Sequence, residues 1–364
     1  SGRSRTGRFV IKLLAIDDSA LMRKLIGQVF AAEAEFQTRF ARDGLEALEE
    51  LGRFKPDVVT LDLRMPRMDG LACLDRIMVE RPTPVVMVAS PMADDVDATL
   101  EAFRLGAVDF MAKPSGPVSL HMTEWGPELV AKVRVAAGAK LRSSLRLRDR
   151  VRHQVGGTTP PRLAVRLARG KSPADDGLVL VGTSTGGPPA LEALVTRLPA
   201  NFPWPVLIAQ HMPASFTGPL ARRLDGLSAL VVSELTRPTR PEAGHVYIGR
   251  GGMDLVVARR GSGLVATTAP PQVGYPWHPS MDRLVRTAME HMPPNQLIGV
   301  LMTGMGDDGS DALTLLHQQG GRTIAEAEET AVIWGMPGEL VKAGGADWVV
   351  PLPGIADRLL RMVV

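Results

Sequence analysis

The feature that most restricts the fold is a repeated pattern, in which a short apolar run ends in polar residues and is followed by a segment with helical spacing. Such runs occur in both halves of the chain, for example at 11–16, 57–61 and 178–181. Buried parallel strands are near-continuous apolar runs, and their alternation with helices is typical of a parallel sheet covered on both faces. The chain is therefore predicted to be an α/β protein with two doubly wound parallel-sheet domains joined by a linker.

Chain length also favours two domains. The 364 residues exceed what one hydrophobic core usually organises, and an apolar content of 45% is sufficient for two cores. We expect a leader at 1–8, a first domain at 9–137, a linker at 138–175 and a second domain at 176–364. Within the linker, 138–171 carries ten Lys or Arg and one Asp, which favours a solvated connector over a surface for acidic partners or lipid headgroups.

A glycine-framed turn in the second half contains a candidate nucleophile. The turn 182–187, Gly-Thr-Ser-Thr-Gly-Gly, follows the apolar run 178–181 and precedes the helix-like segment 188–195. A G-x-S-x-G turn between a strand and a helix exposes its serine hydroxyl, here that of Ser184. Glycines before a helix also form simple tight turns or anion cradles, so the motif alone leaves these alternatives open.

Two more polar clusters end apolar runs of the same half. The run 205–209 leads to His211, and the run 297–302 leads to a loop that contains Asp308. Parallel strands bring their carboxyl ends to one edge of a sheet, so Ser184, His211 and Asp308 are expected to meet there. An imidazole can take the proton of a serine hydroxyl, and a carboxylate can orient that imidazole. The pattern therefore predicts a Ser-His-Asp triad.

Each predicted member of the triad has a structural alternative. His211 would also suit a hydrogen-bonded loop position, and Asp308 would suit a turn or a helix cap. His278, in the segment Trp-His-Pro-Ser-Met-Asp, is the main rival for the role of base.

The first half has a second constellation of polar strand ends. Asp17 and Asp18 follow the run 11–16, Asp62 follows 57–61, and Lys113 follows 107–112. Three carboxylates at one edge are unfavourable unless a hard cation joins them, and Mg²⁺ prefers such oxygen ligands. The lysine ammonium can pair with a phosphoryl group. Capping of the next helix is the alternative for the first two aspartates, and a loop carboxylate is the alternative for Asp62.

The second half contains, in this order, the segments GTSTGG, QHMP, HPSMD, TGMGDDG and WGMPGE. The same order is found in the catalytic domain of chemotaxis protein-glutamate methylesterases, which this half therefore resembles. The resemblance implies hydrolysis of glutamate methyl esters on chemoreceptors and deamidation of receptor glutamines. It implies that Ser184 is the nucleophile, His211 the base and Asp308 the orienting acid. It also implies that the N–H of Met305 contributes to the oxyanion site and that Thr185 lines it. Cleft walls are implied at Met281-Asp282 and 334–337.

The first half contains the segments DDSALMRK, LDLRMPRMDG and DFMAKP. With these segments it resembles a response-regulator receiver domain, which has a flavodoxin-like fold. The resemblance implies that Asp62 accepts a phosphoryl group and binds Mg²⁺ together with Asp17 and Asp18. It implies that Lys113 contacts the phosphoryl group and that Ser90 and Phe110 form a switch pair. An unphosphorylated receiver is expected to cover the catalytic cleft.

Partners and location follow from these resemblances and from composition. Chemoreceptors are the expected substrates, a chemotaxis histidine kinase is the expected phosphodonor, and ester hydrolysis is expected to need no cofactor. The net charge of +3 is small, which argues against nucleic acid, and no apolar run approaches the roughly 20 residues of a membrane span. The single cysteine, Cys73, fits a reducing, cytoplasmic compartment. The alternatives are a catalytically silent receiver-fused docking module and a hydrolase of other esters or amides.

Overall fold

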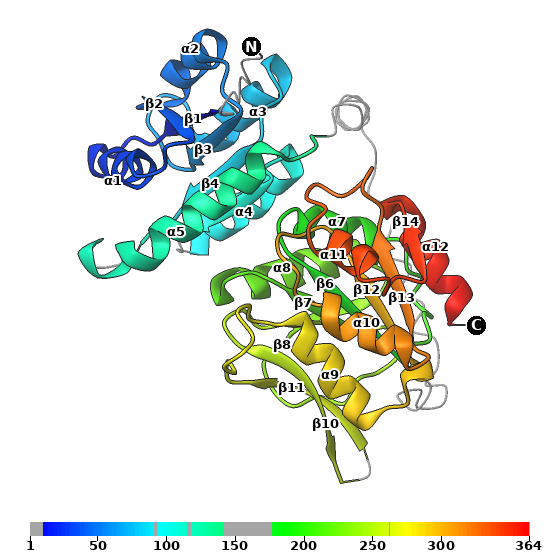
Figure 1. Cartoon of the computed structure of the whole chain (residues 1–364). Helices are drawn as coiled ribbons and strands as arrows, with labels where there is room; N and C mark the ends of the chain where they lie inside the picture. The colour runs from blue at the N-terminus through cyan, green and yellow to red at the C-terminus, as the bar shows by residue number, and fades with distance from the viewer. Residues whose placement is uncertain (1–9, 91–92, 115–117, 142–176, 262, 364) are drawn as a thin grey trace, which may run out of the picture. The chain divides into compact units, whose positions relative to one another are not determined.

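The computed structural model describes residues 10–90, 93–114, 118–141, 177–261 and 263–363 (Figure 1). The chain divides into two compact units, Ser1–Arg148 and Asp149–Val364. The predicted leader and most of the predicted linker lie outside the described residues. Their boundaries stay predictions.

The amino-terminal unit contains a five-stranded sheet in the order β2-β1-β3-β4-β5, and all of its strand pairs are parallel. This is the flavodoxin-like doubly wound order. Helices α2, α3 and α4 pack along one face, while α1 and α5 pack together on the other. The elements are β1 (Ile11–Ile16), α1 (Ala20–Ala31), β2 (Phe36–Ala41), α2 (Gly44–Phe54), β3 (Val58–Asp62), α3 (Gly70–Glu80), β4 (Val85–Ala89), α4 (Ala93–Leu105), β5 (Asp109–Ala112) and α5 (Val118–Ala137).

Side-chain caps start the first helices of this unit. Ser19 is the N-cap of α1 and accepts a hydrogen bond from the N–H of Met22, while Asp43 and Asp69 cap α2 and α3 in the same way. A capping oxygen satisfies N–H groups that have no partner in the first helical turn. Because Ser19 caps α1, helix capping does not account for Asp17 and Asp18.

The carboxyl-terminal unit contains a seven-stranded sheet in the order β14-β13-β12-β6-β7-β9-β8, again with parallel pairs only, and a separate antiparallel hairpin of β10 and β11. The elements are β6 (Leu178–Thr183), α7 (Gly187–Val195), β7 (Val206–Gln210), α8 (Ala214–Leu227), β8 (Val231–Leu235), β9 (His245–Gly249), β10 (Asp254–Arg260), β11 (Gly263–Ala269), α9 (Met281–His291), η2 (Pro294–Gln296), β12 (Leu297–Leu301), α10 (Ser310–Gln318), β13 (Arg322–Glu326), α11 (Met336–Lys342), β14 (Trp348–Val350) and α12 (Leu352–Met362).

The order of strands creates a crevice at the centre of this second sheet. Strands β6, β7 and β12 are fully buried, with α7, α8 and α12 on one face and α9, α10 and α11 on the other (Figure 1). From β6 the chain continues to β7 on one side, whereas β12, β13 and β14 extend the sheet on the other. Ligands of open α/β sheets bind where the strand order reverses in this way. The predicted class, two doubly wound α/β domains, is confirmed.

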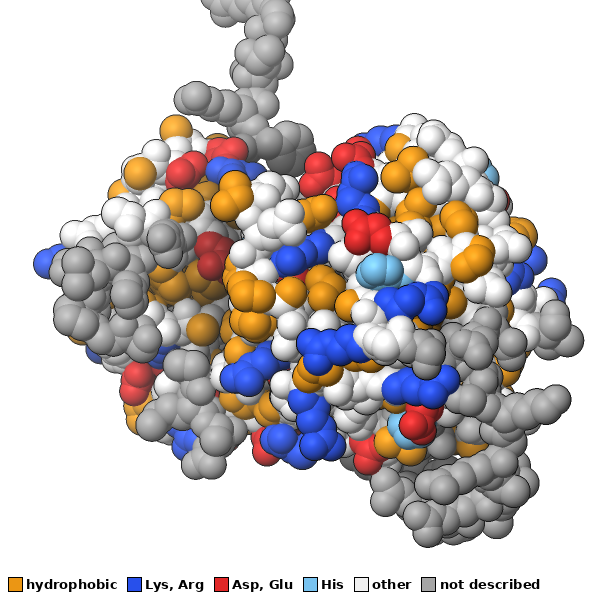
Figure 2. Space-filling view, turned by 90° about the horizontal axis from the view of Figure 1, so that it is seen from below, with side chains coloured by type: hydrophobic (Ala, Val, Ile, Leu, Met, Phe, Trp, Pro, Cys, Tyr) orange, Lys and Arg blue, Asp and Glu red, His pale blue; other side chains and the backbone are white. Residues whose placement is uncertain are grey.

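Surface charge, the hydrophobicity of the helices and the single cysteine bear on binding of charged partners, membrane insertion and thiol chemistry. The face drawn in Figure 2 carries Lys and Arg side chains among acidic and apolar ones, so this face is not of one charge sign. Within the described ranges, no helix combines the length and the hydrophobicity needed to cross a bilayer. Cys73 is a buried free thiol, and burial raises its pKa to about 12. It therefore stays a neutral thiol near pH 7.

Candidate active site and phosphoryl site

The sheet brings the loops of the predicted triad to one edge. Thr183 and Gln210 are register partners on β6 and β7, so Ser184 and His211 are the next residues on two adjacent strands. The N–H of His211 donates to the carbonyl of Thr183 at 3.0 Å, and the N–H of Ser184 donates to the carbonyl of Thr303, beyond β12, at 3.0 Å. The carboxyl ends of β6, β7 and β12 are thus joined directly at the predicted site.

Asp308 is held as an ionised carboxylate that faces His211. Its Oδ2 lies 2.7 Å from Nε2 of His211, and it accepts hydrogen bonds from the N–H of Met281 and Asp282 and from the hydroxyl of Ser280. Burial raises the pKa of Asp308, but the hydrogen bonds and charge of His211 and the backbone donors outweigh it, so the pKa lies below its ordinary value. The amino end of α9 adds the favourable end of a helix dipole.

The histidine ring presents its other nitrogen as the base. A carboxylate only accepts hydrogen bonds, so the proton of a neutral His211 lies on Nε2 and the lone pair on Nδ1. That Nδ1 is buried and has no hydrogen-bond partner among the described residues. The indole ring of Trp277 stacks on the imidazole with centroids 5.2 Å apart. An ordered ring with an unpaired buried nitrogen is suited to accept a proton from a neighbouring hydroxyl.

Two glycines are required by the turn that carries Ser184. Gly186 adopts φ 77° as the N-cap of α7, and a Cβ there would lie 2.8 Å from Cβ of Val332. A Cβ on Gly187 would lie 1.9 Å from Oε1 of Gln210. No other residue fits either position without displacing its neighbours. The predicted sequence of strand, glycine turn and helix is confirmed as β6, the turn and α7.

Thr185 and Met305 lie on the loops around this turn. Thr185 is buried, and its carbonyl accepts a hydrogen bond from the hydroxyl of Thr303 at 2.9 Å. Met305 follows Gly304, whose N–H is used by the carbonyl of Ile333. The N–H of Met305 itself donates to no acceptor in the part of the chain that the structure describes. The role of this N–H in an oxyanion site stays a prediction.

Sequence reasoning missed Gln210 as a residue of the site. Its side chain is buried and donates through Nε2 to the carbonyls of both Ser184 and His211, at 3.1 and 3.0 Å. Its Oε1 accepts the hydroxyl of Thr183 at 2.6 Å. The position of Gln210 in the sequence could have indicated this role. It is a polar residue at the end of a buried strand, where an amide without hydrogen-bond partners would be unfavourable.

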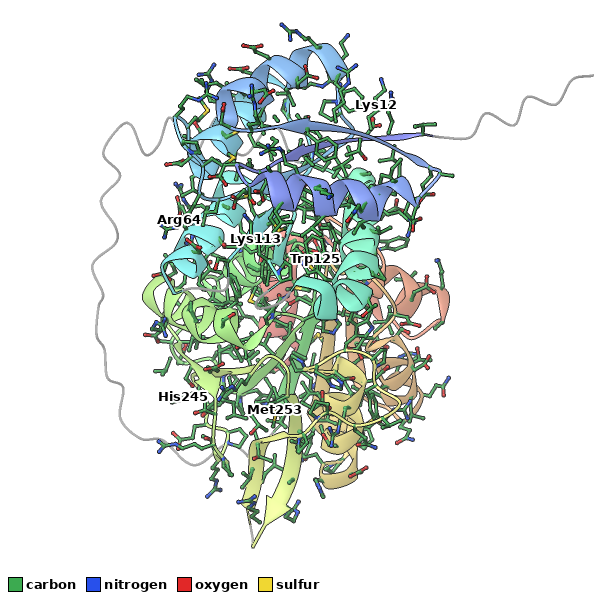
Figure 3. All side chains as sticks on the ribbon, turned by 90° about the vertical axis from the view of Figure 1, so that its left-hand side faces the viewer. Lys12, Arg64, Lys113, Trp125, His245 and Met253 are labelled. Atoms are coloured by element: carbon green, nitrogen blue, oxygen red, sulfur yellow. The ribbon has the colours of Figure 1, made fainter. Side chains whose placement is uncertain are left out.

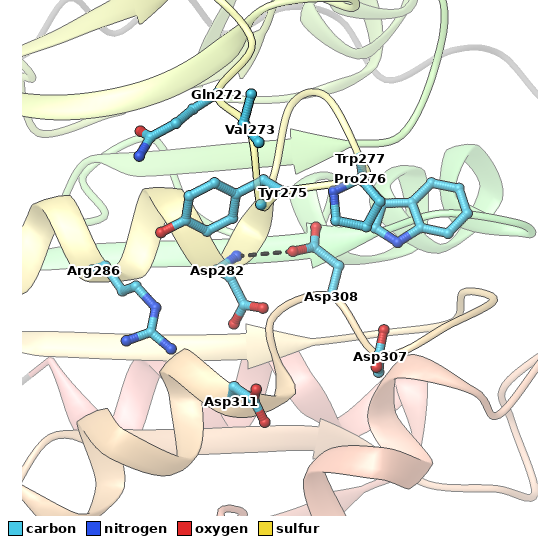
Figure 4. Close-up of a pocket in the computed structure, with 11 residues that line it drawn as sticks. Gln272, Val273, Tyr275, Pro276, Trp277, Asp282, Arg286, Asp307, Asp308 and Asp311 are labelled. Atoms are coloured by element: carbon cyan, nitrogen blue, oxygen red, sulfur yellow. Dashed lines mark hydrogen bonds between the residues drawn. The ribbon is translucent and has the colours of Figure 1, made fainter.

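A pocket of about 530 Å³ adjoins the pair of His211 and Asp308 (Figure 4). Its lining is aromatic on one side and mainly acidic on the other, and consists of 272–277, Asp282, Arg286, Asp307, Asp308 and Asp311. Asp282, which was expected on a wall of the catalytic cleft, lines this pocket. The side chains of Met281 and Met336 were expected there too, but both pack in the hydrophobic core, because they face the sheet from the first residues of α9 and α11.

The rival histidine has a different partner. Nδ1 of His278 lies 2.9 Å from Oδ1 of Asp254, a buried carboxylate that also pairs with Arg283. The structure therefore pairs His211, and not His278, with the acid predicted to orient the base.

The predicted acidic constellation of the amino-terminal unit also assembles. Asp17, Asp18 and Asp62 each offer a carboxylate oxygen within 4.8 Å of the others. Nζ of Lys113, labelled in Figure 3, lies 2.9 Å from Asp17 and 2.8 Å from Asp62. Burial raises the pKa of Asp62 to about 6, although Lys113 opposes this shift. Three clustered oxygen donors with a single lysine leave net negative charge, which fits a hard divalent cation such as Mg²⁺.

The two predicted switch residues occupy neighbouring strands. Ser90 is half-buried directly after β4, and the next two residues lie outside the described part of the chain. Phe110 is buried in β5, where its ring packs edge-on against Phe103 of α4 with centroids 6.1 Å apart. Their pairing as a switch stays a prediction.

Comparison with known proteins gives two family matches and several full-length relatives. Residues 13–123 match the response regulator receiver domain, and residues 179–359 match the CheB methylesterase. A protein-glutamate methylesterase/protein-glutamine glutaminase 2 of Rhodopseudomonas palustris is 56% identical, with 97% of this chain and 98% of the relative covered. A protein-glutamate methylesterase/protein-glutamine glutaminase 3 of Rhodospirillum rubrum is 47% identical, with 96% and 95% covered.

The crystal structure of the Thermotoga maritima CheB methylesterase catalytic domain is 35% identical to this chain with a TM-score of 0.49, and the match covers 51% of this chain and 98% of that structure. The full-length identities are the stronger observation, because they extend over both units at once. On the strength of those identities and of the two domain matches, this chain belongs to the protein-glutamate methylesterase/protein-glutamine glutaminase family.

Proposed function

We propose that this protein is a phosphorylation-activated hydrolase that removes methyl esters from glutamate side chains of chemoreceptors and deamidates receptor glutamines. The names of its full-length relatives, together with a receiver domain in the same chain, support this activity. The observation that carries the assignment to named residues is the 2.7 Å pairing of His211 with Asp308 beside the turn of Ser184.

In the first half-reaction, Oγ of Ser184 attacks the ester carbonyl while Nδ1 of His211 takes its proton. The tetrahedral oxyanion is stabilised by the free N–H of Met305 and by the positive end of α7 beside Thr185. The intermediate collapses when His211 returns the proton to the methoxide oxygen. Methanol leaves, and the glutamyl group stays on Ser184 as an acyl-enzyme.

In the second half-reaction, water attacks the acyl carbonyl and His211 takes one of its protons. The second tetrahedral intermediate expels Oγ of Ser184, which recovers the proton, and a glutamate carboxylate is released. A glutamine side chain follows the same course with ammonia in place of methanol. Throughout both steps, ionised Asp308 stabilises the imidazolium and keeps the ring in one orientation.

In the receiver unit, we propose that Asp62 accepts a phosphoryl group from a chemotaxis histidine kinase. Asp17, Asp18 and Asp62 would hold Mg²⁺, which supplies positive charge to the phosphoryl oxygens. Lys113, already within 2.8 Å of Asp62, would pair with the transferred group. Ser90 and Phe110 would respond to the new charge, and the activated state would differ in how the receiver covers the catalytic cleft.

We place this activity in the cytoplasm, where a histidine kinase and the adaptation segments of receptors are accessible. The single, buried cysteine is compatible with a reducing compartment.

The test is methanol release from methylated chemoreceptor membranes, measured with and without acetyl phosphate and Mg²⁺. The wild type is expected to release methanol, and more with the phosphodonor, while Ser184→Ala releases none and Asp62→Asn keeps only the basal rate. Ser228→Ala serves as a matched control, because the hydroxyl of Ser228 hydrogen-bonds the backbone of Val195 and Leu230 and no residue of the proposed site. Absence of release by folded, phosphorylated wild type would reject the proposal and favour a silent docking module.

A further inference from the structure

Three of the four hydrogen-bond donors to the carboxylate of Asp308 come from a single turn. Oδ2 accepts from His211 and from the N–H of Met281, while Oδ1 accepts from the N–H of Asp282 and, at 2.9 Å, from the hydroxyl of Ser280. Each oxygen thus has two donors. Only one of the four is a side chain other than the catalytic histidine, and that side chain is Ser280.

The direction of this hydrogen bond is determined by the surroundings of the hydroxyl. Ser280 is the N-cap of α9, and its Oγ accepts the N–H of Arg283 at 3.2 Å. Its single proton points to Asp308, because an ionised carboxylate has no proton to donate. Ser280 is 0% exposed, so exchange of this partner for solvent would require the turn to open.

The turn that carries Ser280 is anchored from behind. The N–H of Ser280 donates to Oδ1 of Asp254 at 3.0 Å. Asp254 begins β10, is 0% exposed, and also pairs with His278 and Arg283. The hairpin of β10 and β11 therefore supports the turn, and the turn supports the carboxylate that faces His211.

We infer that Ser280 is a positioning residue of the hydrolytic site, which acts by holding the Asp308 carboxylate in plane with His211. This inference rests on the proposed function. Without the hydroxyl, Oδ1 would keep one donor and the carboxylate would rotate about its Cβ–Cγ bond, so the imidazole would lose its single orientation. Such a residue changes kcat more than KM, because it does not touch the substrate.

The experiment compares Ser280→Ala, Ser280→Gly and Ser280→Thr in the full chain. Both Ala and Gly remove the hydroxyl, but Gly is nearly as good an N-cap as Ser, whereas Ala is poor. We expect kcat for methanol release to fall on the order of 10- to 100-fold in both, as for loss of a hydrogen bond to a charged group, with KM little changed. Ser280→Thr, which keeps a hydroxyl at this position, is expected to restore kcat partly.

The control is Ser228→Ala, a serine-to-alanine change of equal size that breaks two backbone contacts away from Asp308. Wild-type kcat in Ser280→Gly would overturn the inference, provided that the wild type itself releases methanol. A loss in Ser280→Ala that Ser280→Gly does not share would assign Ser280 to helix capping alone. Absence of release by the wild type would instead reject the proposed function, so the two failures are distinguishable.

Discussion

At the scale of single residues, two neighbouring aspartates have opposite electrostatic environments. Asp308 accepts hydrogen bonds at both oxygens, and these donors lower its pKa in spite of burial. The side chain of Asp282 is also removed from water, but the N–H donors of Ala312 and Gly309 do not compensate, and the negative charge of Asp308 adds to the effect. Burial thus raises the pKa of Asp282 to about 6.

The change Asp282→Asn tests this difference through stability. The pKa of Asp282 in the folded state is about 6, above its ordinary value of 3.8, so ionisation of Asp282 lowers the free energy of unfolding. This loss of stability grows as the pH rises from about 4 to 6, and it is complete above pH 6. The neutral amide keeps an acceptor for Ala312, so we expect Asp282→Asn to be more stable than wild type at pH 7.5 by about 1–3 kcal/mol, and similar near pH 4.

Urea unfolding at both pH values measures this prediction. Four of the five tryptophans belong to the catalytic unit, so their fluorescence reports mainly on it. Asp311→Asn is the matched control, since Asp311 lines the same pocket but is exposed. A variant less stable than wild type at pH 7.5 would contradict the raised pKa.

At the scale of elements, the active site depends on how the ends of two strands are tied together. Gln210, the last residue of β7, reaches the hydroxyl of Thr183 on β6 and the two carbonyls that follow the strands. Regular strand pairing stops at this point, so these backbone groups need another partner away from water. One buried amide supplies it for both catalytic loops.

Gln210→Leu removes these contacts while it keeps much of the volume. The carbonyl of His211 and the hydroxyl of Thr183 would lose this partner, whereas the carbonyl of Ser184 keeps the N–H of Gly187. We expect a loss of stability of about 1–3 kcal/mol per group left buried and unpaired, reduced where water enters. The loops of Ser184 and His211 would also lose their common restraint, so methanol release is expected to fall by at least roughly tenfold.

Unfolding and methanol release, measured together, check this prediction. Gln318→Leu is a suitable control, because Gln318 is exposed at the end of α10. Full activity in Gln210→Leu would show that strand pairing alone positions the two loops.

At the scale of the whole molecule, the two units carry unlike chemistry. Among the described residues, the only His, Cys, Asp and Glu side chains clustered closely enough to bind a metal are Asp17, Asp18 and Asp62 in the amino-terminal unit. The paired His211 and Asp308 of the other unit form a proton-transfer arrangement. Under the proposed function, phosphorylation uses a divalent cation and hydrolysis uses proton transfer without a metal, so an experiment can separate the two.

Removal of divalent cations is the corresponding test. With EDTA present, acetyl phosphate is expected to lose its stimulation of methanol release, which should be on the order of 5- to 150-fold for a typical coupling between two sites. The basal rate should not change, because proton transfer through His211 needs no metal.

Excess Mg²⁺ should restore the stimulation in wild type and not in Asp62→Asn, whose side chain cannot accept the phosphoryl group. A basal rate that falls with EDTA and recovers with Zn²⁺ or Mg²⁺ would contradict the separation of the two sites.

Sequence pattern was sufficient to predict the class of the fold. Apolar runs predicted β1, β3, β6, β7 and β12 to within two residues of their observed bounds. Because parallel strands end at a common edge, the order of those runs also predicted that the loops of Ser184, His211 and Asp308 adjoin, and that Asp17, Asp62 and Lys113 cluster. These placements rest on local pattern and on one topological rule, whereas the chemical roles of the residues stay predictions.

The groups that surround those residues became evident only from the folded chain. The contacts of Gln210 with Ser184, of Ser280 with Asp308 and of Trp277 with His211 join segments that are far apart in the chain, and no periodicity of the sequence indicates them. The side chain of Met281 lies in the hydrophobic core and not on a wall of the cleft because of how α9 is rotated against the sheet. An apolar side chain is compatible with both positions, so the sequence did not distinguish them. Sequence pattern specifies elements and their ends, whereas side-chain partners are decided by packing between distant elements, where rotations of a few tens of degrees exchange one neighbour for another.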